Sequence, residues 1–247
     1  MRFAFLVLLL ISNRSEAAEL RVLAIGATAP TLQRVIPEFE RASGHRVVAS
    51  FGPPGPMIEK IASGEVIDAI FISGPRYDDL VKSRAIDAGL VVARFGVGIG
   101  IPKGAAKPDV STAEALKNTL LSAKALGGLG FDNGSVGTET LIGFHKLGIA
   151  DQLVPKYRVY PNGMSVVQAL VRHEIDFGFS VFADMAASKE IDYAGPYPPG
   201  IQTYVPIYAT VRIGTPNEAA VKSLIELVRS KATAEFLKEN WLLPASD

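Results

Sequence analysis

Apolar residues alternate along the chain between two kinds of pattern. Short, mainly apolar runs such as residues 20–25 and 46–51 are typical of strands. Between such runs, apolar residues return every three or four positions, as Leu32, Val35 and Phe39 do, which predicts helices with one buried face. Because strand and helix predictions alternate from residue 20 onward, we expect an α/β fold with mainly parallel sheets flanked by helices.

Two long extended segments interrupt this alternation, one near Phe95 and the other near Val205. A chain of 247 residues is long enough for two lobes with separate cores. We therefore interpret these segments as a two-segment hinge, with residues 18–95 and 206–247 in lobe 1 and residues 96–205 in lobe 2. The alternative is that both segments are ordinary strands of one large domain.

Residues 1–17 have the pattern of a secretory signal peptide. Arg2 precedes an apolar run of nine residues, 3–11, and the small residues Ser15 and Ala17 lie at a candidate cleavage site. The run is far shorter than the roughly 20 residues that a membrane-spanning helix needs. We therefore expect secretion to the periplasm and no stable membrane insertion. A buried N-terminal helix is the alternative.

The composition narrows the range of partners. The sequence has 25 basic and 25 acidic residues and no cysteine. A balanced charge gives no support for binding to nucleic acid or to an anionic membrane surface. Without cysteine, the secreted chain has neither disulfides nor a cysteine that carries a lipid. We therefore expect a freely soluble periplasmic protein.

The segment 52–74 has the most informative polar pattern. A glycine- and proline-rich loop leads into a short helix, which a buried strand follows. In an open α/β sheet such loops gather at the carboxyl ends of the strands, where helix starts offer unpaired N–H groups to a small anion. Similar loops contain Thr28, residues 133–138 and residues 162–165. These positions form a candidate binding cleft, although the threonine and serines there are also suited to capping helices.

The sequence contains no clear catalytic, metal or dinucleotide motif. Its three histidines are far apart and lack metal-ligand spacing. The glycine-rich segment 96–100 leads to Pro102 instead of a helix, which argues against a dinucleotide site. We therefore expect no enzyme activity, no cofactor and no metal. Glu139 and Asp184, near the predicted cleft, keep open the alternative of an enzyme in which a carboxylate acts as a base.

Five segments are characteristic in combination, although each one alone is a weak signal. They are GEVIDAIFIS (64–73), GIGIPKGAAKPD (98–109), LKNTLLSAK (116–124), KLGIADQL (146–153) and AGPYP (194–198). Together they resemble the bacterial extracellular solute-binding proteins of the molybdate-binding-like family, the periplasmic components of ABC importers. The resemblance covers nearly all of residues 20–244.

This resemblance implies a two-lobed periplasmic-binding-protein type II fold that closes over a small solute. It also implies partners, an inner-membrane ABC permease with its ATPase. We expect a monomer that binds a small anionic solute, either a molybdate-like oxyanion or a small organic anion, and delivers it to the permease. Two alternatives stay open, a periplasmic enzyme acting on a small carboxylate on the same scaffold and a solute-sensing module.

The resemblance also indicates which residues would contact the ligand. Two hydroxyl contacts of the family fall on Ala27 and Val181, which have no hydroxyl, and its serine-rich second loop is proline-rich here. These departures favour a ligand that joins an anionic end to a less polar body. The residues expected at the site are Ala27, Thr28, Gly52, Pro54, Gly55, Met57, Ser73, Ser135, Val136, Gly137, Thr138, Asn162, Gly163 and Val181.

Overall fold

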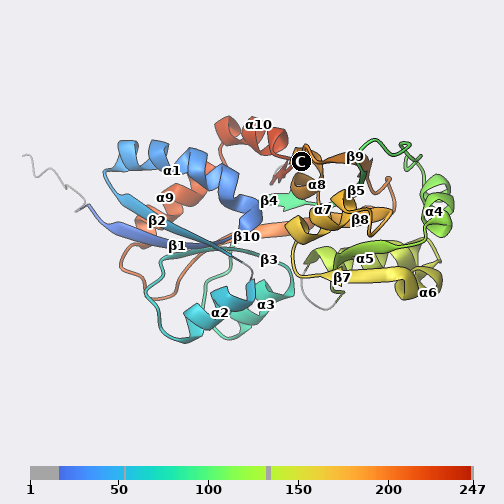
Figure 1. Ribbon diagram of the computed structural model, residues 1–247. Helices are drawn as coiled ribbons and strands as arrows, with labels where there is room; N and C mark the ends of the chain where they lie inside the picture. Colours follow the sequence, from blue (N-terminus) through green and yellow to red (C-terminus); the bar gives the residue numbers. More distant parts are fainter. Residues whose placement is uncertain (1–16, 53, 132–134, 246–247) are drawn as a thin grey trace, which may run out of the picture.

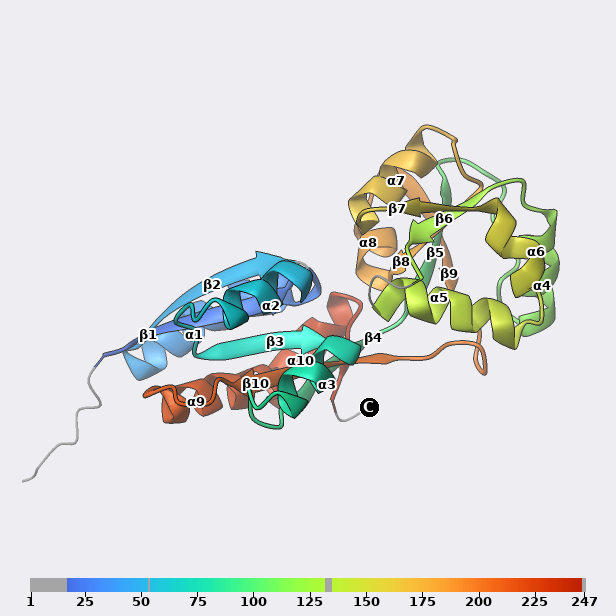
Figure 2. The ribbon, with the colours of Figure 1, turned by 90° about the horizontal axis from the view of Figure 1, so that it is seen from below.

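The strands of the protein form two separate sheets, each flanked by helices. The computed structural model describes residues 17–52, 54–131 and 135–245. Figures 1 and 2 show the sheets in two lobes that lie side by side. The two-lobed α/β fold expected from the sequence is confirmed. Of the predicted signal peptide, residues 1–16 lie outside the described residues.

Lobe 1 is built on a six-stranded sheet with the strand order β11-β4-β10-β3-β1-β2. β1 pairs in parallel with β2 and β3, whereas β10 is antiparallel to β3 and β4, and β11 is antiparallel to β4. The strands are β1 (Glu19–Ile25), β2 (Arg46–Gly52), β3 (Ala69–Ser73), β4 (Leu90–Phe95), β10 (Val205–Val211) and β11 (Leu243–Pro244).

Helices cover both faces of this sheet. Figure 1 shows α1, α9 and α10 on one face and α2 and α3 on the other. The helices are η1 (Gly26–Thr28), α1 (Ala29–Ser43), α2 (Pro54–Ala62), α3 (Pro75–Lys82), α9 (Glu218–Val228) and α10 (Lys231–Glu239). In α1 the buried residues include Leu32, Val35 and Phe39, the same apolar positions that predicted the helix.

Lobe 2 is built on a five-stranded sheet with the order β7-β6-β8-β5-β9. β6 pairs in parallel with β7 and β8, and β5 is antiparallel to β8 and β9. The strands are β5 (Val97–Pro102), β6 (Leu126–Leu129), β7 (Tyr157–Tyr160), β8 (Phe177–Val181) and β9 (Ile191–Pro196). The helices are α4 (Ala113–Ser122), α5 (Ser135–Lys146), α6 (Ala150–Leu153), η2 (Val154–Lys156), α7 (Gly163–Val171) and α8 (Phe182–Ala187).

Each sheet is mixed, with a parallel half and an antiparallel half. The expectation of mainly parallel sheets holds for β2, β1 and β3 and for β7, β6 and β8, which helices connect. Among the antiparallel strands, β4, β5, β9 and β10 precede or follow a crossing between the lobes. They are antiparallel because the chain leaves and re-enters each sheet there without a right-handed helical crossover.

Two segments join the lobes, as the sequence predicted for the hinge (Figure 2). Gly96 lies between β4 and β5, and residues 197–204 lie between β9 and β10. A Cβ atom on Gly96 would lie 2.5 Å from Cζ of Phe182 and 2.6 Å from Nε2 of Gln202. The two crossing segments therefore pack against each other at Gly96, and a larger residue there would require the side chains of Phe182 and Gln202 to move.

Candidate functional site

The carboxyl ends of three parallel strands in lobe 1 lie at one edge of its sheet. Ile25 at the end of β1 pairs in register with Gly52 at the end of β2, and Ala24 pairs with Phe71 of β3. η1, α2 and α3 begin directly beyond these strand ends. In Figure 2 the arrowhead of β3 is directed toward lobe 2. Unpaired N–H groups at these helix starts make this edge favourable for an anion.

Lobe 2 has the same arrangement. α5, α7 and α8 begin beyond the carboxyl ends of β6, β7 and β8, which are mutually parallel. Val136 near the start of α5 is 7% exposed and belongs to the same apolar cluster as the core of lobe 1. Leu129 at the end of β6 and Val181 at the end of β8 pack against that cluster as well. The strand ends of lobe 2 therefore face lobe 1, and we call the region where the two sets of strand ends and helix starts meet the interlobe junction.

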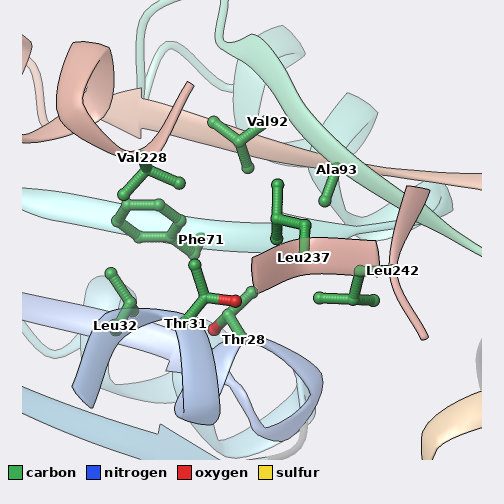
Figure 3. Close-up of a pocket in the computed structure, with 9 residues that line it drawn as sticks. All are labelled: Thr28, Thr31, Leu32, Phe71, Val92, Ala93, Val228, Leu237 and Leu242. Atoms are coloured by element: carbon green, nitrogen blue, oxygen red, sulfur yellow. The ribbon is translucent and has the colours of Figure 1, made fainter. Parts of the chain in front are cut away.

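Thr28 is turned into the core of lobe 1. It is 4% exposed, and its hydroxyl donates a hydrogen bond of 2.7 Å to the carbonyl oxygen of Ile25. Together with Thr31 it lines a small cavity among apolar side chains of lobe 1 (Figure 3). Ala27, next to it, is half-buried against the same core. At this position the structure places the hydroxyl inside the lobe.

The second loop of lobe 1 presents main chain more than side chains. Gly52 ends β2, and Pro54 and Gly55 are the first residues of α2, with Gly55 exposed. Met57 is 3% exposed and belongs to the core, so only its backbone remains available to a ligand. Ser73 ends β3 and is buried. Pro53 lies outside the described residues.

The start of α5 is fixed by a close contact between backbones. A Cβ atom on Gly137 would lie 1.9 Å from the carbonyl oxygen of Gly130, just after β6. Thr138 donates its hydroxyl to the carbonyl oxygen of Phe131 at 3.1 Å. Ser135 is the first residue of α5, so Thr138 lies in the first turn of the helix. Residues 132–134 of this loop lie outside the described residues.

The start of α7 holds a carboxyl group of the protein itself. Asn162 caps the helix by accepting a hydrogen bond from N–H of Ser165 at 2.9 Å. A Cβ atom on the next residue, Gly163, would lie 1.9 Å from Oδ2 of Asp184. The hydroxyl of Ser180 lies 2.5 Å from the same Oδ2. The chemistry at this helix start therefore includes an acceptor as well as N–H donors.

Asp184 is a partly buried acid with a raised pKa. Burial raises the pKa of its carboxyl, and the hydrogen bond from Ser180 opposes that shift. The sequence indicated Asp184 only as a carboxylate near the cleft and missed Ser180. The available signal was the serine at the end of an apolar strand, four residues before an acid in the next helix.

Glu139 is the second carboxyl group near the junction, and it lies at the hinge. It accepts a short hydrogen bond from the hydroxyl of Thr203, in the second crossing segment. Burial raises the pKa of Glu139, and the positive charge of Lys146 partly offsets this effect. Because a carboxylate oxygen of Glu139 accepts this hydrogen bond from the hinge, we assign Glu139 a structural role.

Other side-chain groups give no sign of a metal site. Among residues 17–52, 54–131 and 135–245, no group of three or more His, Cys, Asp or Glu side chains is arranged to hold a metal ion. His45 accepts a hydrogen bond from N–H of Ala18 at 3.0 Å, so its role is local. Within the same described ranges, none of the helices combines the length and apolar character required to cross a membrane.

The amino-acid sequence is similar to those of several known proteins over nearly its whole length. A family model described as bacterial extracellular solute-binding protein matches residues 20–241. Aconitate isomerase from a Pseudomonas species is 25% identical over 248 residues, which cover 96% of this chain and 94% of that protein. The molybdate-binding protein ModA of Escherichia coli is 24% identical over 230 residues, 91% of this chain and 88% of ModA.

Among solved structures, the sulfate-binding protein SubI from Mycobacterium tuberculosis has a TM-score of 0.74 at 16% sequence identity. The superposition covers 92% of this chain and 87% of SubI. At this level of identity the likeness shows a shared fold. This fold is therefore shared with a protein named as a sulfate-binding protein, and a shared fold does not by itself establish a shared ligand.

Proposed function

Because the chain belongs to the family of bacterial extracellular solute-binding proteins, we propose that it binds a small anionic solute at the interlobe junction and delivers it to an inner-membrane ABC permease. The binding site would consist of main-chain donors at the helix starts of both lobes, at the positions predicted from the sequence. The observation that carries this proposal is the burial of Val136, from the start of α5 in lobe 2, in the apolar cluster of lobe 1. An anion at that helix start would contact both lobes at once, and closure would follow from those shared contacts.

We also propose how the protein reaches the periplasm and in which oligomeric state it acts. Residues 1–17 would direct export to the periplasm and be removed, leaving lobe 1 at 18–95 and 206–247 and lobe 2 at 96–205. The mature protein would act as a monomer with a permease and its ATPase as partners, and would bind its solute without converting it.

A thermal-shift screen tests the binding proposal. Molybdate, sulfate, phosphate, succinate and malate are added separately to the purified mature chain. A ligand at 100 times its dissociation constant stabilises the folded state by about 2.7 kcal/mol, which gives a clear rise in melting temperature. The proposal fails if no small inorganic or organic anion produces a saturable shift.

The α5 start can be tested with a matched pair of variants. Val136→Pro removes one N–H in the first turn of α5, where the N–H groups have no acceptor within the helix. Val136→Ala shortens the same side chain but keeps the N–H. We expect Val136→Pro to weaken binding of the best anion at least about tenfold relative to Val136→Ala. Equal affinities would remove α5 from the proposed site. Gly137→Pro is less suitable, since its Cβ would contact the carbonyl of Gly130.

A second candidate function is isomerisation of a small carboxylate. Two observations favour it, the partly buried Asp184 carboxyl with its raised pKa and the similarity to an aconitate isomerase. A carboxyl group in such a position can accept a proton from a bound ligand and return it at another carbon. Incubation with cis-aconitate and with trans-aconitate, followed by chromatography, distinguishes the two functions. Interconversion that Asp184→Asn abolishes would support the isomerase, and unchanged compounds would support binding without turnover.

A further inference from the structure

Asp184 and Ser180 form a compact pair at the edge of lobe 2 that faces lobe 1. Ser180 lies in β8, is 1% exposed, and its hydroxyl oxygen is 2.5 Å from Oδ2 of Asp184. Val181, the last residue of β8, packs against the apolar cluster of lobe 1. Asp184 is half-buried. The pair therefore lies at the interlobe junction, and Asp184 is not fully enclosed by the protein.

Gly163 brings this carboxyl onto the start of α7. The Cβ atom of any other residue at position 163 would lie 1.9 Å from Oδ2 of Asp184 and 2.6 Å from the hydroxyl oxygen of Ser180. The absence of a side chain thus lets the carboxyl approach the first turn of a nine-residue helix. Asn162 already accepts the N–H of Ser165 in that turn. An anionic ligand that reaches the α7 start meets a negatively charged group of the protein as well as N–H donors.

No cation compensates this charge within the described part of the chain. Asp184 has no ion pair among residues 17–52, 54–131 and 135–245, and no charged side chain is among the causes of its raised pKa. A fully ionised oxygen placed against the carboxylate would therefore be repelled. An oxygen that carries a proton can donate a hydrogen bond to the carboxylate, and such a charge-assisted bond is favourable.

Building on the proposed function, we propose that Asp184 makes the interlobe site selective for anions that bring a hydrogen-bond donor, such as hydroxycarboxylates and hydrogen phosphate. Sulfate and molybdate have no proton to donate near neutral pH, so the same group disfavours them. Ser180 acts as a positioning residue, because its hydroxyl holds the carboxyl oxygen against Gly163. This assignment narrows the ligand class from anions in general to anions with a hydroxyl or acidic proton close to the charged end.

Two pairs of compounds isolate the effect of a single donor. Phosphate and sulfate are both tetrahedral and similar in size, and phosphate retains a proton near neutral pH. Malate and succinate differ by one hydroxyl group. Calorimetric titration at pH 7 measures the dissociation constant of each compound for the wild-type mature chain, for Asp184→Asn, and for the control Asp151→Asn, which changes an exposed acid in α6.

We expect the wild-type protein to prefer the donor-bearing member of at least one pair by about tenfold or more, since a site built for a donor rejects the analogue that lacks it. Asp184→Asn should reduce that preference at least severalfold, mainly by improving binding of sulfate or succinate. Asp151→Asn should keep the wild-type preference. The thermal unfolding of each variant without ligand confirms that it is folded.

The outcomes separate this inference from the proposed function. Binding without preference within either pair, or a preference that Asp184→Asn leaves unchanged, contradicts the selectivity assigned to Asp184 while leaving anion binding intact. If none of the four compounds binds to the wild-type protein and the broader anion screen is also negative, the proposed function itself fails. A preference that falls in Asp184→Asn and persists in Asp151→Asn supports the inference.

Discussion

At the scale of single residues, the interlobe junction depends on positions where a side chain would not fit. Gly137 and Gly163 both stand in the first turn of a helix, and each lies close to a group from another segment. At Gly137 that group is a backbone carbonyl, which cannot rotate away as a flexible side chain can. The geometry of both helix starts is therefore sensitive to a single methyl group.

The first prediction concerns Gly137→Ala. Its Cβ would lie 1.9 Å from the Gly130 carbonyl oxygen, so the start of α5 must shift and the free energy of unfolding should fall by about 1–3 kcal/mol. Gly55→Ala is the control, since nothing lies within 4 Å of a Cβ atom in α2 at that position. We expect Gly55→Ala to be neutral or stabilising by up to about 1 kcal/mol. Denaturant titration compares the two, and equal stability would contradict the close contact.

The second prediction concerns the pH dependence of stability at Asp184. Burial raises the pKa of Asp184 in the folded state above its unfolded value of about 3.9, so the folded state binds this proton more tightly. Its contribution to stability is complete below the unfolded pKa and is lost as the pH rises through the folded pKa. Asp184→Asn, which cannot ionise, should therefore gain in stability relative to the wild type between pH 4 and pH 7.

Urea titrations of both proteins at pH 4 and pH 7 measure this change, with Asp151→Asn as the exposed control. A stability difference between Asp184→Asn and the wild type that is the same at both pH values would show that the carboxyl is not held in a buried environment.

Only part of this residue-scale detail could be predicted from the sequence. The turns from strand to helix could be located because glycine, proline and small polar residues mark such turns. The direction of Thr28 into the core depends on packing against α9 and α10, far away in the sequence. The approach of Asp184 to Gly163 joins the first turns of two different helices. Contacts of this kind leave no local pattern.

At the scale of elements, two hydrogen bonds and a ring contact hold one side of α5 against the second crossing segment, residues 197–204. Tyr197 donates its hydroxyl to the carbonyl oxygen of Thr140 at 3.3 Å, and Lys146 donates to the carbonyl oxygen of Ile201 at 3.2 Å. The ring of Tyr197 also covers Gly143, where a Cβ atom would lie 2.3 Å from the ring. The helix α5, which begins at the interlobe junction, is thus in direct contact with one of the two hinge segments.

The third prediction tests this connection with two tyrosines. Tyr197→Phe removes the hydroxyl of a tyrosine that is 2% exposed and should lower the free energy of unfolding by about 1 kcal/mol. Tyr204→Phe removes the hydroxyl of a tyrosine in the same segment that is 47% exposed, and should change stability by only a few tenths of that amount. Thermal or chemical unfolding measures both. A larger loss in the free energy of unfolding for Tyr204→Phe than for Tyr197→Phe would contradict a stabilising hydrogen bond between Tyr197 and α5.

Most helices and strands could be predicted from apolar periodicity. Where a helix begins depends on which of several neighbouring polar side chains caps it. Ser111 and Glu114 have the spacing of a capping box in the sequence. In the structure Thr112 caps α4 instead, and its side chain accepts a hydrogen bond from N–H of Ala115 at 3.1 Å. Ser111 instead donates its hydroxyl to Asp109. Two adjacent hydroxyl residues both fit a cap in the sequence, and the turn at Asp109 decides between them.

At the scale of the whole molecule, the two lobes are in contact away from the crossing segments as well. Trp241 follows α10, next to Leu242 in the core of lobe 1, and Tyr193 lies in β9 of lobe 2. Their ring centroids are 5.6 Å apart in an edge-to-face arrangement. This pair spans the lobes, so a change in their relative position alters the surroundings of Trp241.

The fourth prediction uses Trp241 as a reporter, because it is the single tryptophan of the chain. Saturation with the best anion from the screen should shift or change its fluorescence, since closure of the lobes alters its contact with Tyr193. In Tyr193→Leu we expect the ligand to bind with similar affinity but to give a different spectral change. Saturable binding by calorimetry with no change in Trp241 emission would contradict closure of the lobes at this contact.

The two-lobed architecture was predictable, but the composition of the sheets was only partly so. Alternating strand and helix patterns gave the parallel halves correctly. The antiparallel pairing of β10 with β3 and β4 joins segments separated by more than 100 positions and depends on the chain returning to lobe 1. The sequence shows that return as one long extended segment without indicating its partners.

The central claim is that one small anion binds between the lobes and contacts both. A crystal structure of the mature chain with the best anion from the screen tests it most directly. We predict the anion at the interlobe junction, accepting hydrogen bonds from main-chain N–H groups at the start of α5 in lobe 2 and at a helix start of lobe 1. An anion bound to one lobe only, or on a surface away from these helix starts, would contradict the account.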